Sequence, residues 1–208
     1  MIQKCPAHPE PRSLDALTDH IGETGRRRRQ VLIDRMAHLE HEGLHCFSCS
    51  GVCCTFVANS MQTTPLETVE IIRYLKRAGR LDAELIERLR ETVRRYRLDA
   101  PSPGDGRRHF VRRTYTCPFF MGQARGCSLS RTIKPYGCLG FNPHRPDQTE
   151  GGDCASDTTA LTLREARSAE LETAHNQWLR ARLELDWEKK PMPVALLDIL
   201  ERLAGVPQ

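Results

Sequence analysis

The sequence predicts a mainly α-helical fold in which helices surround a small irregular, cysteine-rich metal core, with room for one short β-hairpin. Two observations lead to this prediction. Apolar residues recur at helical spacing, with capping residues at the starts of the runs, through most of the chain. The pattern is interrupted where eight of the nine cysteines fall among glycines, prolines and turn residues. Regular helices therefore frame a segment that something other than a regular core must hold.

The length of 208 residues suits one large domain, and a hydrophobic fraction of 39% is enough for a core. We expect residues 1–12, which contain three prolines, to form a mobile N-terminus and residues 13–208 to form a single domain. Within it, residues 46–157 form the cysteine-cluster core, interrupted by a helical hairpin over 65–97. Residues 160–205 supply the C-terminal helices.

Composition excludes several classes of protein. The N-terminus has no apolar signal region, and no apolar run approaches the roughly 18–20 residues that span a bilayer. We therefore expect a cytoplasmic protein with no membrane partner. The net charge of +4 is mild, and the run Arg26–Arg29 has no interleaved aromatic residue, so we interpret it as a solvated helix start and do not expect a nucleic-acid partner.

The helices follow from caps and periodicity. Thr64, Pro65 and Glu67 form a helix-start signature, and Asp82 caps a second helix after Gly79 has ended the first. Thr162 and Glu165 form a similar signature before the longest run. The predicted helices cover residues 14–21, 30–42, 65–78, 83–97, 163–188 and 194–204. Residues 55–60 and 109–116 read as short strands, and 117–157 as irregular structure.

Four cysteines fall within nine residues, Cys46, Cys49, Cys53 and Cys54. A thiolate is a strong ligand for soft metals, and in a reducing cytosol clustered cysteines favour metal or redox chemistry over disulfides. The C-x2-C pair can bind one ion from a single turn. Because Cys53 and Cys54 are adjacent, their side chains diverge, so either one ligates while the other packs, or they reach different metals.

The second cysteine group comprises Cys117, Cys127, Cys138 and Cys154, separated by nine, ten and fifteen residues. Ordering such a segment costs about 1–2 kcal/mol per residue, which a metal site would offset. We expect Cys46–Cys54 and Cys117–Cys138 to converge in space. Eight thiols suffice for two four-ligand sites, or for one multinuclear site with spare thiols.

Other side chains near the cysteines are weaker candidates for ligation. His38, His41 and His45 approach Cys46 at helical spacing, but Gly43 is expected to end that helix before His45. His144 follows the second group, and Cys5 forms a C-x2-H pair with His8 in the N-terminus. We interpret these residues as solvated or capping rather than ligating. The cations Arg125, Arg131 and Lys134 lie where they could offset thiolate charge, although ordinary solvation is the simpler interpretation.

The cysteine-rich pieces together resemble a known family. The loop Cys46–Cys54 is followed by Cys-Pro-Phe-Phe at 117, Gly-Cys-Ser-Leu at 126 and Lys-Pro-x-x-Cys-x-x-Phe-x-Pro at 134. This set resembles the CxxCxxCC, or YkgJ-like, cysteine-cluster family, which is described as zinc- or iron-chelating. The chain has one extra residue between Cys49 and Cys53, and Lys134 stands at the family's usual arginine. A more distant resemblance is to the cysteine-cluster domain of flagellin lysine N-methylases, which implies an iron–sulfur centre.

Three hypotheses follow. The first is a metal-binding protein that chelates zinc or iron, including an iron–sulfur cluster, through Cys46, Cys49, Cys53, Cys54, Cys117, Cys127, Cys138 and Cys154. The second is an iron–sulfur enzyme acting in redox chemistry or in modification of a protein side chain, with a protein substrate. The third is storage or delivery of copper(I) or zinc. Thiolates suit all these metals, so the residues alone leave the three open.

Overall fold

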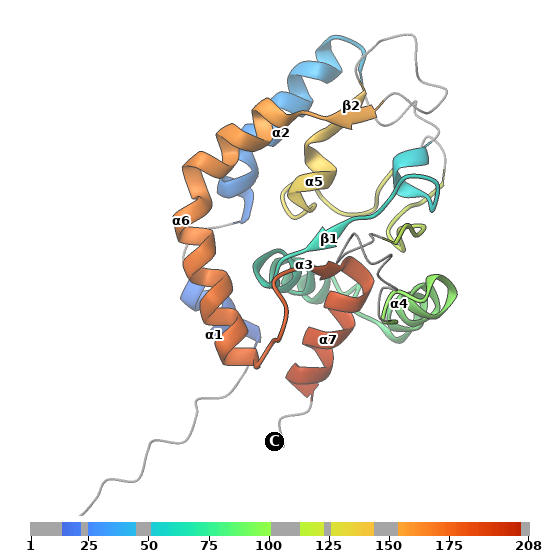
Figure 1. The fold of residues 1–208 in the computed structure, drawn as a ribbon, viewed down its shortest axis with the longest axis vertical. Coiled ribbons are helices and arrows are strands. Elements are labelled where there is room, and N and C mark those ends of the chain that lie inside the picture. Colours follow the sequence, from blue (N-terminus) through green and yellow to red (C-terminus); the bar gives the residue numbers. More distant parts are fainter. Residues whose placement is uncertain are drawn as a thin grey trace, which may run out of the picture.

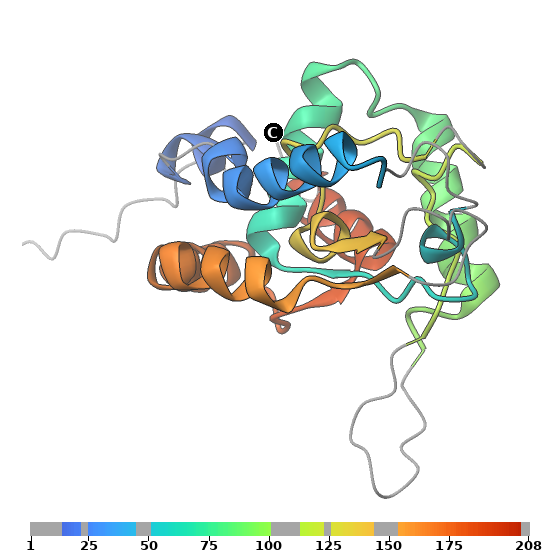
Figure 2. The same cartoon turned by 90° about the horizontal axis from the view of Figure 1, so that it is seen from above.

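The computed structural model describes residues 14–21, 25–44, 51–100, 113–122, 126–143 and 154–204. Helices dominate, as predicted, and the strands form only short two-stranded sheets. Figures 1 and 2 show α6 along one side of the molecule, with α3 and α7 at its centre and α4 on the far side. The helices are α1 (Leu14–Ile21), α2 (Gly25–His41), α3 (Pro65–Arg77), α4 (Ala83–Tyr96), α5 (Tyr136–Leu139), α6 (Thr158–Leu183) and α7 (Met192–Ala204).

Helix α3 is the centre of the main hydrophobic core. It begins as predicted: Thr64 accepts a hydrogen bond from the backbone of Glu67, whose carboxylate accepts one from the backbone of Thr64 in return. Its predicted inward face is completely buried, and it packs against α1, α6 and α7. The hairpin partner α4 is capped by Asp82, also as predicted, and packs on α7. The buried inward residues of α3 are Leu66, Val69, Ile72 and Leu75.

Helix α2 begins at Gly25, five residues before the predicted start, and this changes the interpretation of the arginine run. Arg28 and Arg29 are buried, with 2% and 0% of their surface exposed. The prediction of a solvated helix start is therefore wrong for these two residues. They lie on the inner side of α2, where Glu70 of α3 pairs with both. An arginine can be buried only with such partners, and these come from distant parts of the chain.

The strand predicted over residues 55–60 does not form, and residues 55–58 turn back on themselves. Of the strand predicted over 109–116, residues 109–112 lie outside the described part of the chain, and residues 113–116 belong to no ladder. The two segments nevertheless lie side by side. The Asn59 carbonyl accepts from the Tyr115 backbone at 2.9 Å, and the Asn59 side chain donates to the Tyr115 carbonyl at 2.9 Å. One buried asparagine replaces the ladder, because a side-chain amide can supply the bonds that a strand neighbour would.

The sheets are small. Strand β1 (Gln62–Thr63) pairs antiparallel with β4 (Lys190–Pro191), and β2 (Phe141–Pro143) pairs antiparallel with β3 (Cys154–Ser156). The second pair agrees with the short hairpin that the sequence allows. It brings Cys154 beside the segment that carries Cys138.

Helices α6 and α7 differ from prediction at their ends. Helix α6 starts at Thr158 because the Asp157 carboxylate accepts from the backbone of Ala160, so the predicted start at 163 is wrong. It stops at Leu183 rather than 188, where Glu184 adopts a left-handed conformation with φ of 54°. Helix α7 begins two residues earlier than predicted and accommodates Pro193 in its first turn, where a missing N–H costs nothing.

An acidic side chain holds the segment between α6 and α7. Trp187 Nε1 donates to Asp198 Oδ2 at 2.6 Å, Lys190 Nζ donates to the same oxygen at 2.9 Å, and Arg202 Nε donates to Oδ1 at 2.9 Å. Burial alone would raise the pKa of Asp198, but these three donors hold it below its usual value. No described helix is both long and apolar enough to cross a membrane.

Candidate functional site

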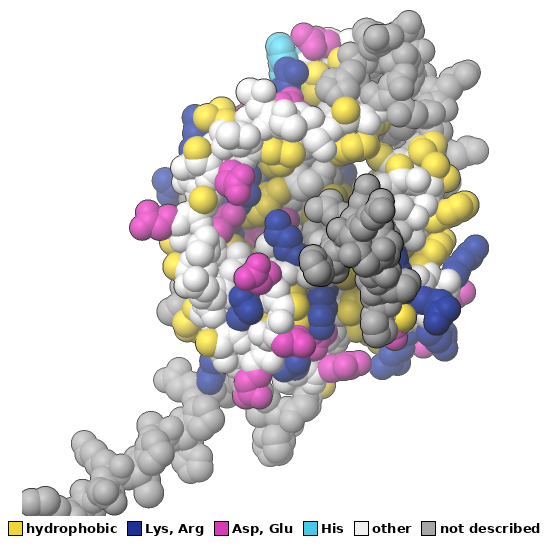
Figure 3. All heavy atoms as spheres, in the orientation of Figure 1, with side chains coloured by type: hydrophobic (Ala, Val, Ile, Leu, Met, Phe, Trp, Pro, Cys, Tyr) yellow, Lys and Arg dark blue, Asp and Glu magenta, His cyan; other side chains and the backbone are white. Residues whose placement is uncertain are grey.

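Six cysteines line a single cavity of about 670 Å³. None of the six takes part in a disulfide, all are half-buried, and they come from both cysteine groups of the sequence. The described members of the two sequence groups therefore reach the same place. Figure 3 looks onto this face, where apolar side chains lie in a hollow beside α6. The cysteines are Cys53, Cys54, Cys117, Cys127, Cys138 and Cys154.

The first pair sits on a tight turn. Gly51, with φ of +72°, leads into a single turn of 3₁₀-helix that carries Cys53 and Cys54. A Cβ at Gly51 would lie 2.4 Å from the ring of Phe120, so only glycine fits there. The Cys54 carbonyl accepts from the backbone of Cys117 at 2.8 Å. This bond joins the first cysteine group directly to the second.

The Cys117-Pro-Phe-Phe stretch folds back on Cys127. Phe119 is buried in the main core and fixes the stretch in place. Phe120 and Cys127 form an isolated antiparallel bridge. The backbone N–H of Leu129 donates to the Cys127 sulfur at 3.4 Å. A hydrogen bond to sulfur stabilises thiolate character and is one of the means by which proteins tune metal-bound cysteines.

Cys138 lies on α5, one short turn whose backbone is held from outside. Arg29 Nε donates to the Lys134 carbonyl at 2.7 Å, and the Tyr136 N–H donates to Glu67 at 2.9 Å. The N–H of Cys138 then donates to the Pro135 carbonyl at 2.9 Å. The position of this thiol is thus fixed by residues of α2 and α3, far away in the sequence.

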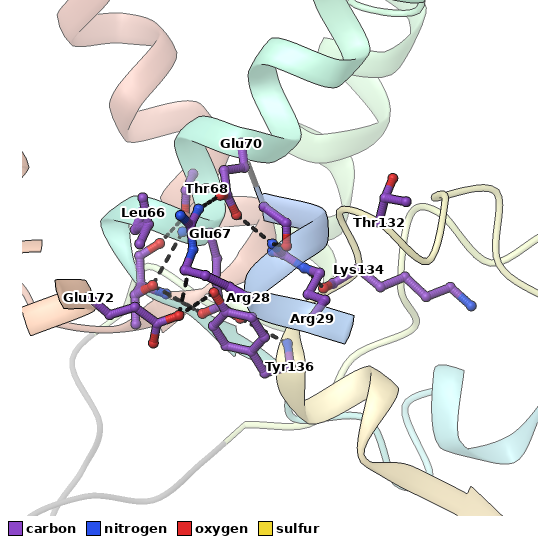
Figure 4. Close-up of polar contacts among 12 residues, drawn as sticks. Arg28, Arg29, Leu66, Glu67, Thr68, Glu70, Thr132, Lys134, Tyr136 and Glu172 are labelled. Carbon is purple, nitrogen blue, oxygen red and sulfur yellow. Dashed lines mark hydrogen bonds and ion pairs between the residues drawn. The ribbon is translucent and has the colours of Figure 1, made fainter. Parts of the chain in front are cut away.

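Tyr136 is the centre of a buried polar cluster (Figure 4). Its hydroxyl donates to Glu172 at 2.6 Å, and burial raises its pKa to about 12. The guanidinium of Arg164 lies 3.4 Å from the ring centroid and that of Arg29 lies 4.7 Å from it, both within cation–π range. Arg164 also pairs with Glu172, and Arg28 lies 3.7 Å from the same carboxylate.

The cluster is balanced in charge. It contains the guanidiniums of Arg28, Arg29 and Arg164 and the carboxylates of Glu67, Glu70 and Glu172, and all six residues are buried. Loss of solvation lowers the pKa of Arg29, with Tyr136 and Glu67 opposing that effect. This cluster could not be predicted from the sequence, because no motif marks a charge that will be buried. Ion pairing offsets the free-energy cost of burying these charges. The cluster also holds the Lys134–Cys138 segment in place beneath the cavity.

The thiols fall into two neighbouring sets. Hydrogen bonds from Cys154 and Cys54 lower the pKa of Cys53 to about 3, while the hydrogen bond to Cys53 raises the pKa of Cys54. In the other set, withdrawal from water raises the pKa of Cys117 to about 12 and that of Cys138 well above its usual value. Cys53 and Cys54 are therefore hydrogen-bonded to each other, and the divergence expected of adjacent side chains does not separate the two thiols.

One lysine lies near thiols of both sets. Lys134 lines the cavity and favours the thiolate forms of Cys53, Cys117 and Cys138. Arg131 instead forms an ion pair with Glu40. Of the three cations considered from the sequence, Lys134 is placed to offset thiolate charge, and Arg125 lies outside the described residues.

The candidate histidines that the structure describes, His38 and His41, are solvated. His38 is 63% exposed at its side chain and lies 3.3 Å from Glu42, and neither it nor His41 lines the cavity. Other candidates lie outside the described residues: Cys5, His8, His45, Cys46, Cys49 and His144. Within the described ranges, no three side chains of His, Cys, Asp or Glu converge closely enough to hold one metal ion.

Thiols are the side chains that soft metals prefer, and six of them line this cavity without forming a disulfide. Their surroundings include a backbone N–H that donates to the Cys127 sulfur and the amine of Lys134, which lies near three of the thiols. Comparison with known proteins adds nothing to this geometry, since no family model, no curated protein and no solved structure matches the chain.

Proposed function

We propose that this protein binds iron or zinc through thiolates of both cysteine groups. The observation that carries the proposal is the meeting of six cysteines, none of them in a disulfide, at one cavity. Cysteines that serve only as small hydrophobic residues would be dispersed through the core. The resemblance of the cysteine motifs to the CxxCxxCC family supports the same proposal. Cys46 and Cys49, as a C-x2-C pair next to Cys53, would complete the ligand set.

Three features of the surroundings support a thiolate centre. Bringing several thiolates together concentrates negative charge, and Lys134 faces three of them. Leu129 donates to the Cys127 sulfur. The buried cluster around Tyr136 holds the Cys138 turn from below. When bound, the metal would join segments that otherwise have little regular structure.

The test is anaerobic purification followed by elemental analysis and a visible spectrum. We expect iron or zinc in a fixed ratio to protein, and loss of most of it in Cys117→Ser and Cys138→Ser. Cys5→Ser is the matched control, because Cys5 lies far from both groups in the sequence, and it should keep full metal content. Metal-free protein with an unchanged melting curve, or equal metal in all three variants, would refute the proposal.

A second candidate, an iron–sulfur enzyme, is favoured by the size of the cavity. A single metal centre does not need about 670 Å³, a volume in the range of small-molecule sites. A brown protein whose visible absorption is bleached by dithionite would support this candidate. A colourless anaerobic preparation with stoichiometric zinc would exclude it, and more than two metal ions per chain would instead favour storage or delivery.

A further inference from the structure

The cavity extends well beyond the thiols, along one face of α6. Leu161, Glu165, Ala169, Thr173 and Asn176 line it, at intervals of four, four, four and three residues. Fifteen residues of α-helix span about 22 Å. An extended polypeptide rises about 3.3 Å per residue, so this length matches a stretch of six or seven residues. The cavity is therefore a groove with α6 as one wall.

The segment around β1 forms another wall, through Ser60, Met61, Gln62 and Thr64. The backbone hydrogen-bonding groups of this segment alternate in direction from one residue to the next. The Met61 carbonyl accepts from Met192, and Gln62 stands opposite Pro191, which has no N–H. In an antiparallel ladder, hydrogen-bonded and non-hydrogen-bonded residue pairs alternate, so Gln62 and Pro191 form a non-hydrogen-bonded pair. The N–H and carbonyl of Gln62 point away from β4.

Ser60 repeats the same orientation two residues earlier. Neither its N–H nor its carbonyl has a hydrogen-bond partner within the described residues. The segment thus presents two donor–acceptor pairs at a spacing of two residues, on the side away from β4. Another extended backbone matches this spacing, because it repeats its own donors and acceptors at the same interval.

The charges along the groove add a preference. Lys134 and Lys189 line it, and neither forms an ion pair with any described side chain. Glu67 and Glu172 also line it, but their carboxylates are already occupied by Thr64, Tyr136, Arg28 and Arg164. Of the described carboxylates on the wall, Glu165 alone has no bonded partner. Lys189 lies next to β4, near the Thr63 end of β1.

We propose that this groove binds an extended segment of a partner protein, which adds as a strand to the free edge of β1 at Ser60 and Gln62 and carries an acidic side chain that faces Lys189. The bound segment lies between β1 and α6, and the thiols lie in the same cavity, within reach of its side chains. The proposal goes beyond metal binding and does not depend on it.

The probe is a fluorescein-labelled eight-residue peptide selected against the purified protein from a random library. Gln62→Pro removes the edge N–H without removing a bond to β4, and proline is tolerated at a free strand edge. Gln62→Ala is the matched control, because it changes the side chain and keeps the N–H. We expect Gln62→Pro to weaken binding in fluorescence anisotropy about tenfold or more, and Gln62→Ala to bind as the parent does.

Two further measurements make the result specific. N-methylation of the peptide at successive positions should abolish binding at alternate residues only, as strand pairing requires. Selected peptides should be rich in Asp and Glu, and Lys189→Glu should reverse that preference. Circular dichroism and the melting temperature of each variant confirm that it is folded.

Several outcomes would overturn the proposal. One is equal binding to the Gln62→Pro and Gln62→Ala variants, and another is tolerance of N-methylation at every position. Failure of the library to yield a peptide that binds below about 100 μM, roughly −5.5 kcal/mol, is a third. Self-association that Gln62→Pro abolishes would assign the edge to a second copy of the chain instead. Elemental analysis of the same samples reports on metal binding separately.

Discussion

The buried charge cluster offers the sharpest test of the fold. Glu70 pairs with Arg28 and Arg29, whose side chains are completely buried, while its own side chain is 8% exposed. Glu70→Gln keeps the shape of the side chain and removes its charge. The cluster would then hold three guanidiniums and two carboxylates, with an uncompensated positive charge shielded from water. Removing one partner of a buried pair costs about 3–5 kcal/mol.

The assay is urea denaturation followed by far-ultraviolet circular dichroism. The midpoint should fall while the m-value stays constant, because the surface exposed on unfolding is the same. Glu84→Gln is the matched control: Glu84 pairs with Arg88 on the exposed side of α4, where its side chain is 81% exposed. That change should shift stability by no more than about 0.5 kcal/mol.

A compensating variant tests the cause. Arg28→Met combined with Glu70→Leu removes one positive and one negative charge, so the cluster stays balanced although Arg29 also loses its pair with Glu70. Replacing a buried ion pair by apolar side chains is often neutral or stabilising. We expect the double variant to recover much of the loss caused by Glu70→Gln. If Glu70→Gln lies within about 1 kcal/mol of the parent, the guanidiniums are not held in a low-dielectric interior, and the reasoning fails.

Three further predictions concern the site and its supports. Gly51→Ala should lower both melting temperature and metal content through its clash with Phe120, whereas Gly122→Ala, with similar positive φ but nothing within 4 Å, should show only the backbone strain of about 1 kcal/mol. Tyr136→Phe removes a buried donor to a carboxylate and should cost about 1.5–3 kcal/mol in urea denaturation. The pKa of Asp198 is lowered on folding, so its ionised carboxylate contributes to the free energy of unfolding above about pH 4, and this contribution is lost as the pH falls through the pKa of the folded protein. Asp198→Asn should therefore lose less stability than the parent between about pH 5 and 3. An acid denaturation curve unchanged by that substitution would contradict the assignment.

Much of the helical framework could be predicted from local sequence. Thr64 and Asp82 act as caps where they were expected, because capping depends on residues within one turn of each other. Helix ends governed by distant contacts were predicted less well. Helix α2 begins earlier because Arg28 and Arg29 find partners on α3 and in the Lys134–Tyr136 turn, and α6 begins earlier because Asp157 caps it ahead of the capping box at Thr162.

The candidate site divides in the same way. Which thiols are available, and that they form two groups, could be read from the chain alone, since spacing and residue type are local properties. The fold was needed to show that six of them line one cavity, that Lys134 lies near three of these while Arg131 pairs with Glu40, and that charged residues from α2, α3 and α6 hold the turn before Cys138. The physical reason is that a buried charge or an unpaired strand edge is defined by its partners, and those partners lie far away along the chain.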